Sequence, residues 1–159
     1  AQGPGTVLAN IANAFAIGAE AKALYPFLAN PQGASDAQIG AFLGSVYDNL
    51  FNRAPDAAGL GYWTGEIRLD LQAGRLVGSV LVDIMGGAQD SPTGKDLTSL
   101  MGKVAVSLAF VEQQALHHMQ WQGAADTAAA AALLDPVTAE PHSVLIGIRN
   151  GEFLVANHG

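Results

Sequence analysis

The chain has no cysteine and few charged residues, and each of these absences excludes a class of protein. Without cysteine it cannot hold a disulfide, a zinc–thiolate site, an iron–sulfur cluster or a cysteine nucleophile. Only 13% of its 159 residues are charged, about half the usual share. Seven Lys and Arg stand against 14 Asp and Glu, which gives a net charge of −7. A surface of that sign repels phosphate backbones and anionic lipid, so we expect no nucleic-acid partner.

Long apolar runs and catalytic motifs are missing as well. No run reaches the roughly 18–20 apolar residues of a membrane helix, so we expect no membrane insertion. Residues 1–5 carry neither the basic region nor the hydrophobic core of a signal peptide. We therefore expect that the chain begins after a cleaved signal or was cut from a longer protein. It contains no Gly-x-Ser-x-Gly elbow, His-Glu-x-x-His, Walker loop or dinucleotide fingerprint, so we predict that it is not an enzyme.

We also predict no metal and no cofactor. Asp90, Ser91 and Asp96 surround a glycine-containing loop and could bind calcium weakly. They lack the alternating oxygen ligands of a defined calcium loop, so capping of the following helix is the favoured role.

What the chain has instead is helical periodicity from end to end. The clearest pattern covers residues 36–51, and Ser35 with Gln38 forms a capping box in front of it. Asp56 is the expected N-cap of the next helix. The predicted fold class is all-α, a compact bundle of about six or seven helices. The expected helices are 6–25, 36–51, 57–69, 74–86, 96–120 and 126–134.

Five of these helices carry apolar faces that we expect to point to the core, among them the first helix and the long helix. In the first helix, Leu8, Ile11, Phe15 and Ala19 share a face. The stripe of the long helix 96–120 consists of Leu97, Leu100, Met101, Val104, Leu108, Val111, Ala115 and Met119.

Residues 141–159 fit two structures. Asn150-Gly151 lies between two apolar runs, which is a strong hairpin signal. Pro141 after Glu140 is typical of a helix start. We favour the helix, because a lone hairpin is marginally stable in water. Gly151 is then expected in or near a helix break.

A weak internal repeat appears at a shift of 69 residues, where Ile11, Phe15 and Gly18 align with Val80, Ile84 and Gly87. Chance similarity between Ala- and Gly-rich helices is the alternative explanation. The repeat divides the chain into three segments within one globular domain. These are the back half of a first unit in 1–34, a complete helical unit in 35–135, and a closing helix or tail in 136–159.

Residues 46–63 carry the densest motif, Val-Tyr-Asp-Asn-Leu-Phe-Asn-Arg-Ala-Pro-Asp-Ala-Ala-Gly-Leu-Gly-Tyr-Trp. This segment resembles a bacterial secreted and surface-protein repeat domain of unassigned function, whose signature includes Arg-x-Pro-Asp-x-x-Gly-Leu-x-Tyr-Trp. The family occurs in repeats-in-toxin exoproteins, adhesins and S-layer proteins, and it is similar in style to the phycobilisome linker domain. Flanking likeness extends the resemblance to about residues 7–145. The upstream Arg-x-Pro-Asp copy and the calcium-binding nonapeptide are missing, so any calcium role would belong to other parts of a parent protein.

The motif is interpreted first as a folding signature. Pro55 sets the turn, Asp56 caps a helix and Gly59 lets two helices pack closely. The functional alternative is a ligand pocket lined by Arg53 and Trp63. The candidate contact residues are Tyr47, Arg53, Tyr62, Trp63 and Trp121.

The resemblance implies a non-catalytic module of a secreted or cell-surface bacterial protein that serves anchoring, adhesion or S-layer-type assembly. Its expected partners are cell-surface polysaccharide, a mode that S-layer relatives imply, or other surface proteins, with self-association included. The alternatives are a protein–protein linker or self-assembly module and an accessory domain of an extracellular enzyme. An aromatic pocket with few charges would favour glycan binding, and a flat apolar face would favour assembly.

Overall fold

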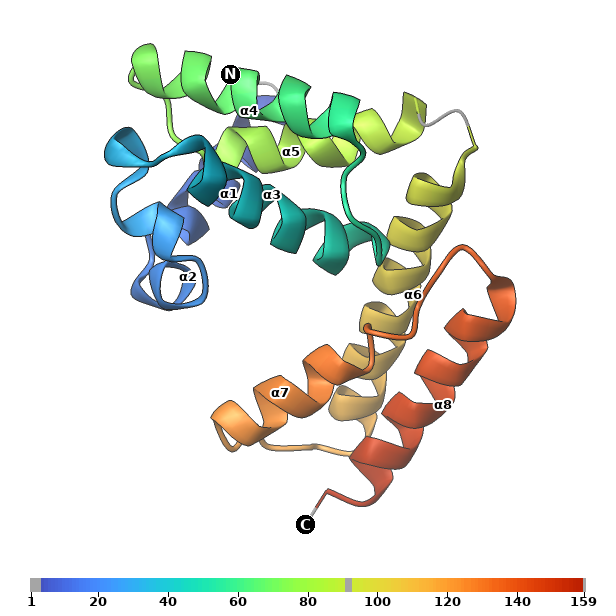
Figure 1. Cartoon of the computed structure of the whole chain (residues 1–159). Helices are drawn as coiled ribbons and strands as arrows, with labels where there is room; N and C mark the ends of the chain where they lie inside the picture. Colours follow the sequence, from blue (N-terminus) through green and yellow to red (C-terminus); the bar gives the residue numbers. More distant parts are fainter. Residues whose placement is uncertain (1–3, 91–92, 159) are drawn as a thin grey trace. The chain divides into compact units, whose positions relative to one another are not determined.

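The chain folds into helices joined by loops, as Figure 1 shows for the computed structural model of the protein. The structure describes residues 4–90 and 93–158, and no strand occurs in these ranges. The predicted all-α class is therefore confirmed. The α-helices are α1 Pro4–Ala16, α2 Ala19–Leu24, α3 Asp36–Phe51, α4 Ala57–Gln72, α5 Gly78–Gly87, α6 Lys95–Leu116, α7 Ala124–Ala132 and α8 Pro141–Ala156. Short 3-10 helices lie at η1 Pro26–Ala29, η2 Pro31–Gly33 and η3 Ala88–Asp90.

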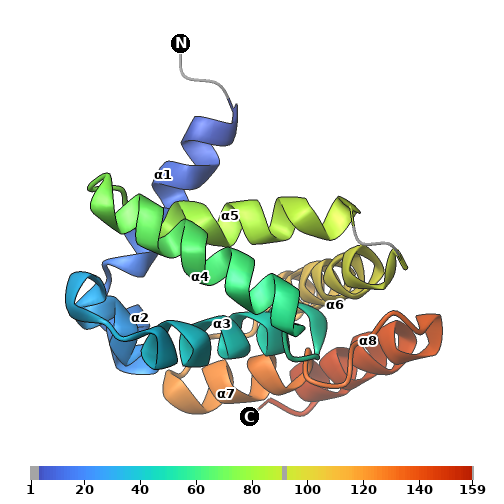
Figure 2. The ribbon, with the colours of Figure 1, turned by 45° about the horizontal axis from the view of Figure 1, so that its top comes forward.

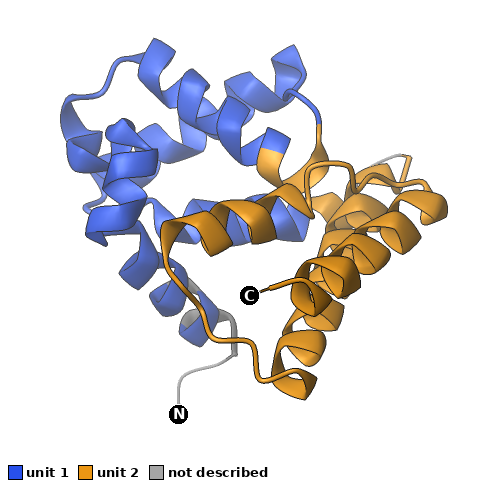
Figure 3. Ribbon diagram, turned by 90° about the horizontal axis from the view of Figure 1, so that it is seen from below, with its two compact units in different colours: residues 1–48, 53–87 blue, residues 49–52, 88–159 orange. Residues whose placement is uncertain are grey.

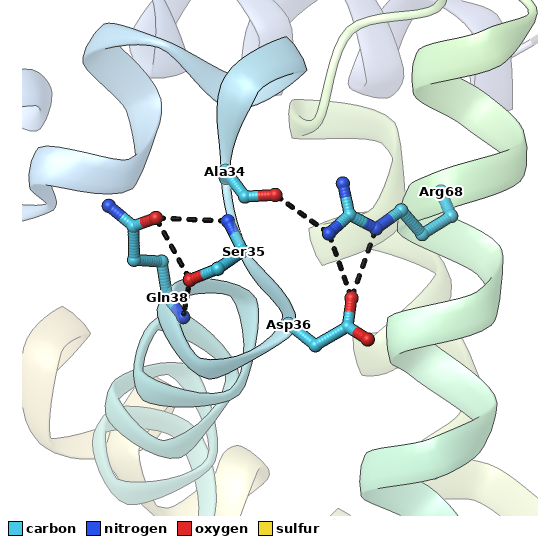
Figure 4. A network of polar contacts seen from close by, with 5 residues as sticks. All are labelled: Ala34, Ser35, Asp36, Gln38 and Arg68. Carbon is cyan, nitrogen blue, oxygen red and sulfur yellow. Dashed lines mark hydrogen bonds and ion pairs between the residues drawn. The ribbon is translucent and has the colours of Figure 1, made fainter.

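Helix α3 has the predicted bounds, and its capping box is confirmed. The amide of Ser35 donates to Gln38 Oε1 at 2.9 Å, and the amide of Gln38 donates to Ser35 Oγ at 3.3 Å (Figure 4). Each side chain thus satisfies a backbone N–H that has no partner inside the helix. Arg68 of α4 donates to the Ala34 carbonyl at 2.7 Å and pairs with Asp36 at 2.8 Å. These contacts fix the start of α3 against α4.

Helix α4 also starts as predicted, because Asp56 Oδ1 accepts from the amide of Gly59 at 2.7 Å. Its end explains why the predicted helix 74–86 starts too early. Gly74 has φ +69°, its amide donates to Leu71, and the amide of Arg75 donates to the Asp70 carbonyl. This pair of bonds around a left-handed glycine is a Schellman motif, which terminates a helix. Gly74 therefore closes α4, and α5 begins only at Gly78.

The prediction of one continuous helix over 6–25 is wrong. The helix is interrupted at residues 17–18, and Gly18 adopts an extended backbone with ψ 152° in front of α2. The expected inward face is wrong too, since Ile11 and Phe15 are exposed. Helix α1 instead packs across α5 (Figure 2). The contact uses small residues, and Gly78 lies directly on the backbone of Ala12.

Residues 141–156 form helix α8, so the favoured helix is confirmed and the hairpin alternative is wrong. The expected break at Gly151 is also wrong. Gly151 is buried in the continuous helix, and a Cβ there would lie 3.5 Å from Phe110 and 3.6 Å from Leu133. Gly151 thus serves helix packing, and Asn150-Gly151 forms no turn.

Helix α6 buries a different face from the one its apolar pattern predicts. It packs along α8 (Figure 1), and its buried residues include Gly102, Val106 and Phe110. Glycines let the two helices approach, because a Cβ on Gly147 of α8 would lie 2.8 Å from Val106. Four residues of the predicted core stripe are exposed on another face. This α6 stripe consists of Met101, Val104, Leu108 and Val111, which are exposed by 57%, 42%, 65% and 59%.

The predicted end of this long helix at residue 120 is also too late. The helix stops at Leu116, and His118 follows with φ +53°. The amide of Met119 donates back to the Gln114 carbonyl at 3.0 Å, so a second Schellman-type arrangement closes α6.

The chain forms two compact units, which Figure 3 colours separately. Unit 1 comprises residues 1–48 and 53–87, and unit 2 comprises residues 49–52 and 88–159. Ile39, Leu43 and Ile67 are fully buried in unit 1. The core cluster of unit 2 consists of Val106, Phe110, Leu133, Val137 and Val155. The predicted boundaries after residues 34 and 135, and the single globular domain, stay predictions.

Candidate functional site

Four of the five candidate contact residues come together in unit 1, between α3 and α4. The indole Nε1 of Trp63 donates to the hydroxyl of Tyr47 at 2.8 Å. The guanidinium of Arg53 lies 5.1 Å from the centre of the Tyr47 ring, in a cation–π contact. The ring of Tyr62 meets Trp63 edge-on, with 4.8 Å between ring centres. The motif therefore builds one aromatic corner.

This corner uses most of its polar groups internally. Tyr47 is only 7% exposed, and its hydroxyl is occupied by Trp63. A Cβ on Gly59 would lie 3.4 Å from that hydroxyl and 3.3 Å from Asp56 Oδ1, so a larger residue would crowd both. Tyr62 is 59% exposed, so its side chain is available to a partner. These contacts support the interpretation of the motif as a folding signature. Ligand contact by its residues stays a prediction.

Trp121, the fifth candidate, belongs to unit 2. Its ring is 48% exposed and lies 6.5 Å from the ring of Phe110. It borders a groove of about 250 Å³ whose other walls come from α6, α7 and the residues that follow α7. Val111 of the α6 stripe lines the same groove, so this end of the stripe and Trp121 border one groove.

A second cavity of unit 2, of about 540 Å³, lies beside the carboxyl end of α8. His158 Nε2 lies 3.0 Å from Asp126 Oδ2 in its wall, and the amide of Gln122 donates to the same oxygen at 2.6 Å. The bond from Gln122, and after it the bond from His158 and its charge, lower the pKa of Asp126 against the opposing effect of desolvation. Asn150 and Phe153, which is 71% exposed, also line this cavity, and polar and apolar residues contribute to its walls in equal number.

Sequence reasoning missed a buried polar network in unit 2. Asn52, just after α3, donates from Nδ2 to the carbonyls of Asp135 at 2.5 Å and Val137 at 2.7 Å. Lys103 is 7% exposed and donates to the Asn49 carbonyl at 2.6 Å and to Asn52 Oδ1. Asn52 has φ +53°. An Asn directly after an apolar helix is typical of this left-handed position. This pattern in the sequence could have indicated the role of Asn52.

Two features would indicate metal or membrane chemistry in the described residues, namely clusters of metal-ligating side chains and helices that could span a membrane. Within 4–90 and 93–158, no group of three His, Asp or Glu side chains is placed to hold a metal ion. Asp96 is buried in the first turn of α6, whose N-cap is Gly94, and capping by the residues of this loop stays a prediction. Ser91 lies outside the described residues. No helix in the described ranges combines the length and the apolar character that crossing a membrane requires.

Comparison with known proteins adds no relative. No protein-family model matches the chain, and no curated protein or solved structure matches it. The resemblance of residues 46–63 to the surface-protein repeat domain therefore stays an expectation, and function must be argued from the site itself.

Proposed function

We propose that this chain is a non-catalytic assembly module of a secreted or cell-surface bacterial protein, and that it works by docking the α6 stripe onto another protein. The observation that carries the proposal is the exposure of this stripe. Leu108 and Val111 are 65% and 59% exposed on a helix whose opposite side is already packed on α8. A contiguous apolar patch of this kind on a folded surface is typical of protein interaction sites.

The contacts of the aromatic corner also support assembly over catalysis. Tyr47 and Trp63 bind each other, and Arg53 stacks on Tyr47. These are bonds that hold two helices together, whereas an active site would leave such groups aimed at a substrate. The secreted or surface location rests on the resemblance of residues 46–63 to the repeat domain of exoproteins, adhesins and S-layer proteins.

A second candidate function is binding of cell-surface glycan in the cavity beside α8. The supporting observation is the exposed ring of Phe153 next to the carboxylate of Asp126 and the amide of Asn150. An apolar ring face with a few fixed polar groups is the arrangement that fits a sugar. A glycan array with the protein and a Phe153→Ala variant tests it. Saturable binding that the variant loses supports this function, and equal signals from both exclude this cavity.

Thiol accessibility on cells tests the assembly function, and the absence of native cysteine makes the assay clean. Leu108→Cys places a thiol on the α6 stripe. Leu145→Cys places a control thiol on α8, where the native side chain is 60% exposed. Each variant is produced in the bacterium that makes the protein, and intact cells are treated with a membrane-impermeant maleimide.

The two thiols report on occupancy and on location. Protection at residue 108 with labelling at residue 145 is the expected result, because a docked partner covers only the stripe. Labelling of both thiols on cells would overturn assembly through α6. Absence of labelling at both positions on intact cells, with labelling of both after lysis, would overturn the surface location.

A further inference from the structure

The α6 stripe has the residue spacing of a helix–helix seam. Met101, Val104, Leu108 and Val111 follow one another at intervals of three, four and three residues. Leu97 and Ala115 extend the pattern by one position at each end. Alternating steps of three and four place the residues at the a and d positions of a heptad, where the side chains of one helix insert between those of another. The spacing therefore calls for a second helix as the partner.

We infer that this partner is α6 of a second copy of the chain. The two helices pack antiparallel about a two-fold axis that passes the stripe at the level of residue 106, whose own side chain points into the core. This inference rests on the proposed function and names its partner. Antiparallel pairing about residue 106 sets Leu108 against Val104 of the other copy. It sets Val111 against Met101, and Ala115 against Leu97. Each layer then combines a longer side chain with a shorter one, so the layers have similar volumes, as dense packing requires. The seam is complementary to itself, which a two-fold interface demands.

The charges on α6 favour the same arrangement. Between Leu97 and Ala115 the only charged residues are Lys103, which is buried, and Glu112. A chain with net charge −7 can therefore present this face to a second copy with little repulsion. Antiparallel pairing separates the two Glu112 residues by about 18 Å along the helix axis, which exceeds the screening length of about 8 Å at physiological salt. Parallel pairing would place them at the same level.

The groove beside the seam gives the second helix additional room. The groove of about 250 Å³ borders Val111 and is lined on its far side by Ala130, Ala131 and Trp121. Small alanine side chains permit close approach of a neighbouring helix. The seam from Leu97 to Ala115 is about 27 Å long, which puts the interface at the small end of specific contacts. We therefore expect a reversible dimer with a dissociation constant in roughly the micromolar range.

Sedimentation equilibrium tests whether the dimer forms. The purified chain is expected to shift from 16.3 kDa toward twice that mass as its concentration rises. Leu108→Glu puts a carboxylate into two symmetry-related layers and should weaken dimerisation about 100-fold, a factor of ten for each copy. Leu145→Glu on α8 is the matched control and should leave the dissociation constant unchanged. Circular dichroism confirms that both variants fold.

Disulfide trapping tests the orientation. A mixture of Met101→Cys and Val111→Cys chains should form a mixed disulfide, because the two positions face each other across the seam. Neither variant should link to itself, since the two copies of residue 101 lie about 15 Å apart along the axis, and bridged Cα atoms lie within about 7 Å. A disulfide of Met101→Cys with itself would overturn the antiparallel register.

The failure of this inference and that of the proposed function are distinguishable. A chain that stays monomeric at every concentration overturns self-association. If residue 108 is nevertheless protected on intact cells, the stripe docks on a different protein and the assembly function stands. If residue 108 is labelled on cells, both fail.

Discussion

Gly78 is the position where one added methyl group should most disturb unit 1. Gly78 begins α5 and is buried where α5 crosses α1. A Cβ there would lie 2.5 Å from the carbonyl carbon of Ala12 and 2.5 Å from the amide nitrogen of Asn13. These are backbone atoms, so no side-chain rotation can relieve the overlap. Helix α1 has to move away from α5.

The expected cost follows from the contacts that such a shift breaks. Overpacking in a close contact costs about 1–3 kcal/mol. The amide of Ser79 donates to Asn13 Oδ1 at 3.1 Å, and losing that bond costs about 1 kcal/mol. The gain in helix propensity of Ala over Gly, about 1 kcal/mol at most, opposes these terms. Gly78→Ala should therefore lower the free energy of unfolding by about 1–3 kcal/mol.

Gly86→Ala is the matched control on the same helix. A Cβ on Gly86 meets no atom within 4 Å, so only the propensity gain remains, about 0.5–1 kcal/mol of added stability. Urea unfolding is followed by the fluorescence of Trp63, which belongs to unit 1, in a Trp121→Phe background. Gly78→Ala should unfold at lower urea than the parent, and Gly86→Ala at higher urea. Equal midpoints for the two variants would refute the close contact between α1 and α5.

Three further predictions concern single polar residues. Asn52→Ala should be less stable than Asn52→Gly by about 1 kcal/mol in urea unfolding. Both variants lose the same side-chain hydrogen bonds, and only Gly adopts φ +53° without strain. Equal stabilities of the two variants would contradict this reasoning. Asp56→Ala should cost about 1 kcal/mol of unfolding free energy, since the amide of α4 that it caps loses its acceptor. The bonds from Gln122 and His158 lower the pKa of Asp126 below its ordinary 3.8, so its carboxylate stabilises the folded state above pH 4 and this contribution is lost as the pH falls through the lowered pKa. The difference in urea midpoint between the protein and Asp126→Asn should be largest at pH 5–7 and shrink as the pH falls below 3.8, and a difference that grows on acidification would contradict the sign.

Local rules determined the helix ends that the sequence predicted well. Ser35 with Gln38 and Asp56 satisfy free amides within a few residues of themselves, so their effect does not depend on the rest of the chain. The all-α class followed in the same way, because helical periodicity runs through the whole sequence. The aromatic corner was also within reach, since its residues lie close together in one motif.

Packing decided what the local rules left open. Asn150-Gly151 is a turn signal in isolation, yet α8 runs through it because Gly151 lets Phe110 and Leu133 approach the helix. Close packing through small residues also explains why α1 and α6 bury faces other than those that their apolar patterns predict. Hydrophobic periodicity finds the apolar side of a helix but cannot tell a core from an exposed surface.

The sequence by itself therefore determined that the chain is helical, where α3 and α4 begin, and which residues form the signature motif. Only the tertiary structure decided that α6 packs on α8 through Gly102 and Gly147 and leaves Leu108 exposed. The physical reason is that glycines allow the closest approach of two helix backbones. The helix faces that carry them become the buried ones, and larger apolar side chains elsewhere on α6 are left for a partner.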